Sequence, residues 1–526
     1  MSDRRKLGVQ DALWLEMDRP NNLMVVDSVI WTDEPLEWDR VRDVISERLI
    51  ERYPVFRSRA VRDDDGHWWW EEHDGFSLDE HMAIVELDDP DDPRALQALV
   101  AEHRTEMLDR DRPLWRALMV DRYREGSAIV LRSHHALADG MRMVQLSMSL
   151  FDAAPEGGPI MGPGVTQHAA HPAEPGQAIA GRVRSGVANV GHQAGGAARA
   201  AVESGQQAAA LVGRAPEVVA GTAHLARAAM TNPVGAGHTL VTGAWALAGD
   251  TVASIRSSLQ SAVPGSGPLV DIFSAAPGDL DTARKLLLGT RNDEAMWTGA
   301  AGVDKAVAWS EPLSLDAVKA VARANRATVN DVLVTCAAGA LHQYLEAHGE
   351  RCSSVTFMVP VNLKPIDLSL PADLGNGFAL VQLELPVDQP DPRQVLRVAK
   401  ARMGRIKNGH EAAVAFRIQE AMAGLSRSIY EASVDLLANR TVGTLTNVPG
   451  PPIPVYLAGR RVEGIVGWAP LSGDQPMSFT IYSYDGRVTV GIACDRGLVP
   501  DHETIVDGFA AAFDALRSRS PSVVGP

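Results

Sequence analysis

The chain has 526 residues, of which 45% are hydrophobic and 22% are charged, and its formal net charge is −16. A chain of this length exceeds what one hydrophobic core supports, so we expect two or more domains. The acidic balance, with no local cluster of basic residues, argues against a nucleic-acid-binding surface, because a polyanion would be repelled.

The cysteines and the N-terminus indicate the compartment. Cys336, Cys352 and Cys494 are widely spaced and match neither a disulfide framework nor a metal knuckle. The charged residues 1–6 are not followed by the apolar region of a signal peptide, and no apolar run is long enough to span a bilayer. We therefore expect a cytoplasmic protein, whose membrane contact would be peripheral, at the inner membrane or at lipid droplets.

Helical and extended patterns alternate over the first 160 residues. An amphipathic helix is predicted where Val41, Ile45 and Leu49 repeat on one face, and the aromatic run 68–70 is predicted to lie on a strand. Residues 116–120 form a second strand candidate, which should pair with the strand that precedes His134.

The most informative stretch is HHALADG, from His134 to Gly140. It follows the apolar run 128–131 and precedes a helix-like run from 141 to 151, so strand, turn and helix are predicted. A loop of this kind can hold one imidazole at the mouth of a pocket, where a neutral ring can take a proton from an alcohol. The simpler alternative is a surface turn. A zinc site is disfavoured, because neighbouring strand residues face opposite sides and no other ligands stand nearby.

Glycine, alanine, serine and glutamine dominate from about residue 161 to 265. We expect an Ala/Gly-rich, partly helical linker, since each interior glycine weakens a helix by up to about 1 kcal/mol relative to alanine. Its arginines could give a weakly basic face that rests on an anionic membrane or lipid droplet. A plain connection between domains is the favoured alternative. The domains are thus expected at 1–160 and 266–526.

The second domain also mixes strands and helices. Thr328-x-x-Asp331 has the spacing of a capping box and starts a predicted helix, so both residues could serve only to close the helix end. Asn330 lies between them, and its amide could donate a hydrogen bond to a reacting carbonyl if the helix start faces a pocket. Two strands joined through Asp485-Gly486 predict a hairpin, and Asp501 is expected to cap the last helix.

These motifs, taken in order, resemble the bacterial wax ester synthase/acyl-CoA:diacylglycerol acyltransferase family. The resemblance is carried by HHALADG, Pro113-Leu114-Trp115, Asn330-Asp331, Pro360-Val361-Asn362-Leu363, Leu374-Gly375-Asn376, Asn447-Val448-Pro449-Gly450-Pro451 and Gly491-Ile492-Ala493-Cys494-Asp495-Arg496. It covers residues 10 to 518 except the linker. One departure is Met24-Val25, where the family often has Met-His; this bears on the acceptor end of the pocket.

The resemblance implies an α/β (α+β) fold with two CoA-dependent-acyltransferase-like domains, each a mixed sheet flanked by helices, and a tunnel at their interface. It implies an O-acyltransferase that moves a long-chain acyl group from acyl-CoA to diacylglycerol, a long-chain alcohol, or both. His135 would be the base that deprotonates the acceptor, and no covalent enzyme intermediate, metal or cofactor other than the co-substrate acyl-CoA is required.

The remaining site residues are also assigned by the resemblance. His134 would pack behind the loop and support the second histidine, Asp139 would order the loop, and Gly140 would leave room for the CoA arm. Asn330, with its neighbour Asp331, would position the substrate or stabilise the oxyanion.

Three other functions compete with this one. A condensation-type domain shares HHxxxDG but works beside carrier domains, for which the chain has no room. A CoA-dependent transferase acting on another alcohol or amine would use the same histidine. The third is a non-catalytic lipid-surface protein, and loss of acyl transfer in His135→Ala would distinguish it.

Overall fold

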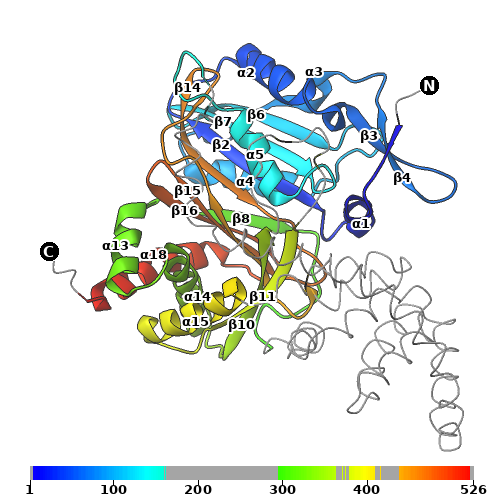
Figure 1. Cartoon of the computed structure of the whole chain (residues 1–526). Helices are drawn as coiled ribbons and strands as arrows, with labels where there is room; N and C mark the ends of the chain where they lie inside the picture. The colour runs from blue at the N-terminus through cyan, green and yellow to red at the C-terminus, as the bar shows by residue number, and fades with distance from the viewer. Residues whose placement is uncertain are drawn as a thin grey trace, which may run out of the picture.

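The computed structural model describes residues 4–158, 160, 294–362, 370, 374, 378–408, 415 and 438–521. The expected linker, 161–265, lies outside the described residues, so the predicted domain limits beside it stay a prediction. The described residues form two units, each a sheet with helices packed on it, and the units lie one above the other in Figure 1. The expected α/β class with two mixed-sheet units is confirmed.

The first unit is built on a six-stranded sheet. In spatial order its strands are β13 (Tyr456–Leu457), β14 (Arg460–Trp468), β2 (Val25–Thr32), β7 (Gly126–His134), β6 (Trp115–Tyr123) and β5 (Met82–Val85). The predicted pairing of β6 with β7 is confirmed, because the two run antiparallel with Ala117 opposite Leu131. Both strands are largely buried, as expected of a central pair with helices on the sheet.

Helices and a small sheet cover the first unit. They are β1 (Arg4–Lys6), α1 (Val9–Met17), α2 (Trp38–Ile45), a π-helical turn (Ser46–Ile50), a 3₁₀ turn (Pro54–Arg57), β3 (Ser58–Arg62), β4 (Trp68–Glu72), α3 (Leu78–His81), α4 (Pro93–His103) and α5 (Gly140–Ser149). The aromatic run 68–70 lies on β4, as predicted, in a three-stranded sheet of order β1-β4-β3. One core contains residues of α1, α2 and α5, and a second contains residues of α4.

The second unit holds a seven-stranded sheet of order β11-β10-β12-β15-β16-β8, with β9 beside β16. Its elements are β8 (Lys305–Trp309), β9 (Leu313–Ser314), α13 (Leu315–Ala324), α14 (Val329–Ala347), β10 (Ser354–Asn362), β11 (Phe378–Pro386), α15 (Pro392–Asn408), β12 (Gly443–Pro449), β15 (Met477–Tyr484), β16 (Arg487–Asp495) and α18 (His502–Arg519). The predicted hairpin is β15–β16, and Thr328 and Asp331 form the predicted capping box. Asp501 is the N-cap residue of α18, without a side-chain cap bond.

One strand crosses between the units. β14 follows β12 in the chain, yet it pairs antiparallel with β2, from Val462 opposite Thr32 to Trp468 opposite Asp27. In Figure 1 this orange strand lies among the blue and cyan strands of the first unit. The six-stranded sheet therefore takes two strands from the range expected to form the second domain, a connection that the sequence pattern does not indicate.

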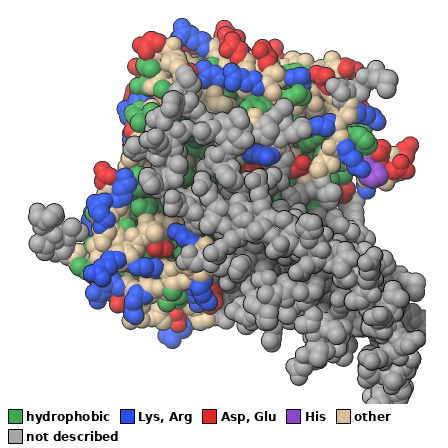
Figure 2. All heavy atoms as spheres, in the orientation of Figure 1, with side chains coloured by type: hydrophobic (Ala, Val, Ile, Leu, Met, Phe, Trp, Pro, Cys, Tyr) green, Lys and Arg blue, Asp and Glu red, His purple; other side chains and the backbone are tan. Residues whose placement is uncertain are grey.

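The surface in Figure 2 carries acidic and basic side chains interspersed over both units, with smaller hydrophobic areas between them. Within the described residues, no helix combines the length and the apolar character that crossing a bilayer requires.

Gly464 on β14 provides a test of the crossing strand. A Cβ added there would overlap the Trp31 ring, which is held by stacking on Trp309 at a centroid distance of 6.1 Å. We expect Gly464→Ala to lower the free energy of unfolding by about 1–3 kcal/mol, as overpacking does. Chemical denaturation measures this change.

The matched control is Gly404→Ala in α15, where an added Cβ meets nothing within 4 Å. This substitution should leave the free energy of unfolding unchanged or raise it by up to about 1 kcal/mol, because alanine has a higher helix propensity than glycine. Equal effects of the two substitutions would contradict the close packing of β14 on β2.

Candidate active site

The backbone fixes the histidine pair at the end of β7. The N–H of His134 donates to the carbonyl of Leu114 at 2.9 Å, and the N–H of His135 donates to the carbonyl of Met24, just before β2, at 2.8 Å. The motif thus leaves the sheet while still bound to chain on both sides. Strand, turn and helix follow one another as predicted, with α5 starting at Gly140.

His134 is fully buried and faces away from solvent. Its Nδ1 accepts the N–H of Ala136 at 3.1 Å, which leaves Nε2 to carry the proton of the neutral ring. That Nε2 lies 3.6 Å from the carboxylate of Asp18. Burial lowers the pKa of His134, although the nearby carboxylate opposes the shift. His134 is therefore a neutral, structural ring.

Asp18 organises the support behind the motif. Its carboxylate accepts from the N–H of Met24 at 2.7 Å and from the guanidinium of Arg110 at 2.8 Å. Burial raises the pKa of Asp18, but the nearby His134 ring and these two partners outweigh that effect, so the pKa falls below its ordinary value. An ionised carboxylate thus ties the segment after α1 to the loop. No motif spacing points to Asp18 or Arg110, and sequence reasoning missed both.

His135 lies in different surroundings from His134, because its side chain lines a cavity of about 300 Å³. Only 5% of the residue is exposed. The indole of Trp14, on α1, stacks on its imidazole with ring centroids 4.1 Å apart and planes 30° apart. No pattern in the sequence points to Trp14 at this position, since a single tryptophan in a helix is usually a core residue.

Asp139 and Gly140 complete the turn. Asp139 is the N-cap of α5, and its carboxylate accepts the N–H of Arg142 at 2.9 Å, which satisfies one free donor of the first turn. Gly140 lines the same cavity as His135, and a Cβ added there would meet no atom within 4 Å. The cavity is therefore open at this glycine.

The cavity lies between the two units. Its wall combines residues of β2, α5, β14 and the second sheet. They are Val26, Ser28 and Ile30 of β2, Met141, Met143, Val144 and Ser147 of α5, Ile465, Val466, Gly467 and Trp468 of β14, and Met358, Leu380, Thr444, Thr446, Asn447, Val448, Thr480 and Tyr482 of the second sheet. Most of these side chains are apolar. A few polar groups stand among them, including the Thr446 hydroxyl, which donates to the Thr480 hydroxyl at 3.1 Å.

The residues predicted on α14 lie outside this wall. Asp331 is buried, and its carboxylate accepts the N–H of Thr328 at 2.8 Å, which completes the capping box. Asn330 accepts a hydrogen bond of 3.0 Å from the side-chain amide of Asn447, which does line the cavity. The structure thus brings His135 and Gly140 together at the cavity, while Asn447 stands between it and Asn330.

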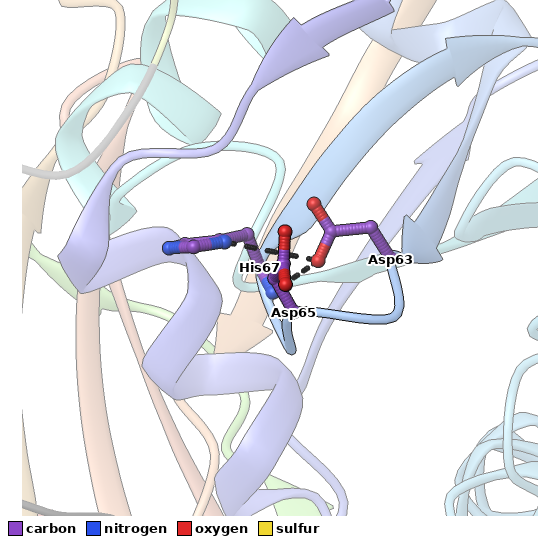
Figure 3. Close-up of side chains that lie close together, drawn as sticks. All are labelled: Asp63, Asp65 and His67. Carbon is purple, nitrogen blue, oxygen red and sulfur yellow. Dashed lines mark hydrogen bonds and ion pairs between the residues drawn. The ribbon is translucent and has the colours of Figure 1, made fainter.

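Figure 3 shows three potential metal ligands on the β3–β4 hairpin, Asp63, Asp65 and His67. Asp63 already serves the hairpin, because its carboxylate accepts the N–H of His67 at 2.7 Å and the indole N–H of Trp69 at 2.7 Å. Asp65 and His67 are exposed, as acidic turns commonly are. The cluster lies on a different sheet from the cavity and lines no part of it.

Two family models match most of the chain. The wax ester synthase/diacylglycerol acyltransferase catalytic domain matches residues 7–248, and the C-terminal domain of the same family matches residues 374–517. The chain belongs to this family. It is accordingly an acyltransferase, and the family resemblance of the sequence motifs is confirmed.

The relatives agree with this assignment, and the solved structures agree with the fold. A Mycobacterium tuberculosis H37Rv protein, named as a candidate diacylglycerol O-acyltransferase, is 25% identical over 99% of both chains. Another from that strain is 26% identical over 91% of this chain and 85% of its own. In fold, the chain resembles a wax ester synthase/diacylglycerol acyltransferase from Marinobacter aquaeolei, with TM-score 0.60 and 16% identity over 98% of both chains. It also resembles in fold the first condensation domain of the calcium-dependent antibiotic synthetase, with TM-score 0.52 and 12% identity over 99% of this chain and 98% of that domain's chain.

Asp18→Asn tests the support behind the histidines. The amide keeps an acceptor for Met24 but removes the charge that faces Arg110, so we expect a loss of about 1–3 kcal/mol in unfolding free energy at pH 7. Because the folded-state pKa of Asp18 lies below its ordinary 3.8, this stabilisation is present above about pH 4 and is lost as pH falls through the folded value. The difference between wild type and variant should therefore shrink in acid.

Urea unfolding between pH 3 and pH 8 measures this difference. Asp91→Asn is the control, since the Asp91–Arg122 pair has the same chemistry but is largely exposed, and such pairs contribute little. Equal stability of Asp18→Asn and wild type at pH 7 would contradict the proposed support.

Proposed function

We propose that this acyltransferase moves a long-chain acyl group from acyl-CoA to the hydroxyl of diacylglycerol or of a long-chain alcohol, with His135 as general base. The observation that carries the proposal is the different placement of two adjacent histidines. His134 is buried behind the loop, whereas His135 lines a mainly apolar cavity between the units.

The reaction follows from that placement. The imidazole of His135 takes the proton of the acceptor hydroxyl, and the oxygen attacks the thioester carbon. When the tetrahedral intermediate collapses, the carbon–sulfur bond breaks and the imidazolium returns the proton to the CoA sulfur. The acceptor is itself the nucleophile, so no acyl-enzyme is needed.

The neighbouring residues support this chemistry in different ways. Asp139 holds the turn through its cap bond, so it acts on the loop rather than on the substrate. His134 and Asp18 brace the loop from behind. Asn447 presents its amide at the cavity wall and is the candidate partner for the reacting carbonyl, held by Asn330 at 3.0 Å.

The wall of the cavity favours an alkyl chain. Met141, Met143, Val144 and Met358 all line it, and each buried CH₂ of a substrate gains about 0.8 kcal/mol on leaving water. Flexible methionine side chains adapt to chains of different shape. This supports a long-chain donor over an acetyl donor. Contact with a membrane or lipid droplet, where such substrates reside, stays a prediction.

Replacing His135 tests the base. Acceptor-dependent CoA release from palmitoyl-CoA, measured with hexadecanol or dioleoylglycerol, should fall by about 10²–10⁴-fold in His135→Ala, the usual contribution of a general base. His67→Ala, an exposed histidine of the β3–β4 hairpin, should retain wild-type activity. Full activity of His135→Ala would rule out the mechanism, and the more active acceptor identifies the preferred substrate.

Substitutions of Gly140 test whether the donor occupies the open space beside this residue of the cavity wall. Because a Cβ meets no neighbour there, Gly140→Ala should fold normally, and Gly140→Leu should place its longer side chain in the space that the donor needs. We expect KM for palmitoyl-CoA to rise about tenfold in Gly140→Leu, since a mispositioned donor loses binding before chemistry. Unchanged KM in a folded Leu variant would place the donor elsewhere.

A further inference from the structure

Trp14 makes a contact that the proposed reaction has not used. Its indole and the imidazole of His135 lie with centroids 4.1 Å apart and planes 30° apart, which is a stacked arrangement. Trp14 also lines the cavity, so the same side chain contacts the base and borders the substrate space. The contact joins α1, near the start of the chain, to the loop after β7.

Arg110 anchors the end of α1, the helix that carries Trp14. The guanidinium of Arg110 donates to the carbonyl of Leu15 at 3.0 Å and to the carboxylate of Asp18 at 2.8 Å. The residue after Trp14 and the end of its helix are thus tied to the chain ahead of β6. An indole carried on an anchored helix can fix the orientation of the ring on which it stacks.

Stacking also has an electrostatic consequence. His135 is 5% exposed and borders a mainly apolar cavity, so water solvates its protonated form poorly. The face of an indole carries negative charge in its quadrupole and attracts a cation above it, more strongly when the pair is desolvated. The neutral ring gains less from this contact than the imidazolium does.

The geometry points to Trp14 as a positioning residue of the acyl transfer. Its indole holds the His135 ring in one orientation and stabilises the imidazolium that forms when the acceptor loses its proton. The inference rests on the proposed role of His135 as base. Trp14 itself takes no part in bond changes, because the proton passes from the hydroxyl to the imidazole and from there to the CoA sulfur.

A graded series of substitutions separates this role from that of a plain cavity wall. Leucine and methionine supply apolar surface without a π face, whereas phenylalanine keeps the face. With palmitoyl-CoA and saturating hexadecanol, we expect kcat of Trp14→Phe within about threefold of wild type, and kcat of Trp14→Leu and Trp14→Met lower by about tenfold. KM should stay within about twofold in all three.

Two results of this series would overturn the inference. One is wild-type kcat in the Leu and Met variants, and the other is a loss confined to KM, which would make Trp14 a substrate contact only. If Trp14→Leu does not fold, the comparison of Met with Phe decides in the same way. Thermal unfolding of each variant establishes which case applies.

A control and a double variant complete the test. Trp38, another half-buried tryptophan on a helix of the first unit, donates its indole N–H to Asp121 at 3.0 Å, and Trp38→Leu should keep wild-type kcat. In the His135→Ala background, Trp14→Leu should cause no further loss, because it acts through the imidazole. A further loss there would overturn the inference. If wild type shows no acceptor-dependent CoA release with either acceptor, the proposed function fails, and this inference with it.

Discussion

The arrangement of the candidate active site depends on the backbone pairing of β2 with β7 on one side and with β14 on the other. This pairing joins three distant parts of the chain and places the carbonyl of Met24 where it binds the N–H of His135. The side chains on the two faces of β2 have different surroundings. Val26, Ser28 and Ile30 line the cavity. On the opposite face, Arg132 Nε donates to Asp27 Oδ1 at 3.1 Å.

The same scaffold gives two chemically identical side chains different properties. Adjacent residues at a strand end point in different directions, so His134 enters the core and His135 reaches the cavity. His134 is held neutral by burial, beside a carboxylate that stays ionised. The N–H of Ala136 satisfies Nδ1 of His134, which offsets part of the free-energy cost of burying the ring. In the proposed reaction, this buried ring would keep the neighbouring histidine in place while the proton moves.

Local features of this fold could be predicted from the sequence, because their causes lie within a few residues. The capping box at Thr328, the β15–β16 hairpin and the strand–turn–helix around HHALADG all belong to this kind. The place of β14 and the bond between Asp18 and Arg110, 92 residues apart, could not be predicted, since neither leaves a periodic or spacing signal. Asn330 shows where prediction from the sequence stops. The motif that contains it could be recognised, but the sequence does not indicate that Asn447, rather than Asn330, lines the cavity.

The crossing of β14 has a consequence for how the chain is made. Until residue 460 has left the ribosome, β2 is an edge strand with unpaired N–H and C=O groups. The N-terminal sheet therefore stays incomplete for most of synthesis, and it is open to pairing with strands of other chains. Tyr484 then fastens the late strand, because its hydroxyl donates to the carbonyl of Val462 at 2.8 Å and accepts the N–H of Val455 at 3.0 Å. The wall of the cavity therefore cannot be complete before β14 and β15 have been synthesised, because both strands contribute residues to it.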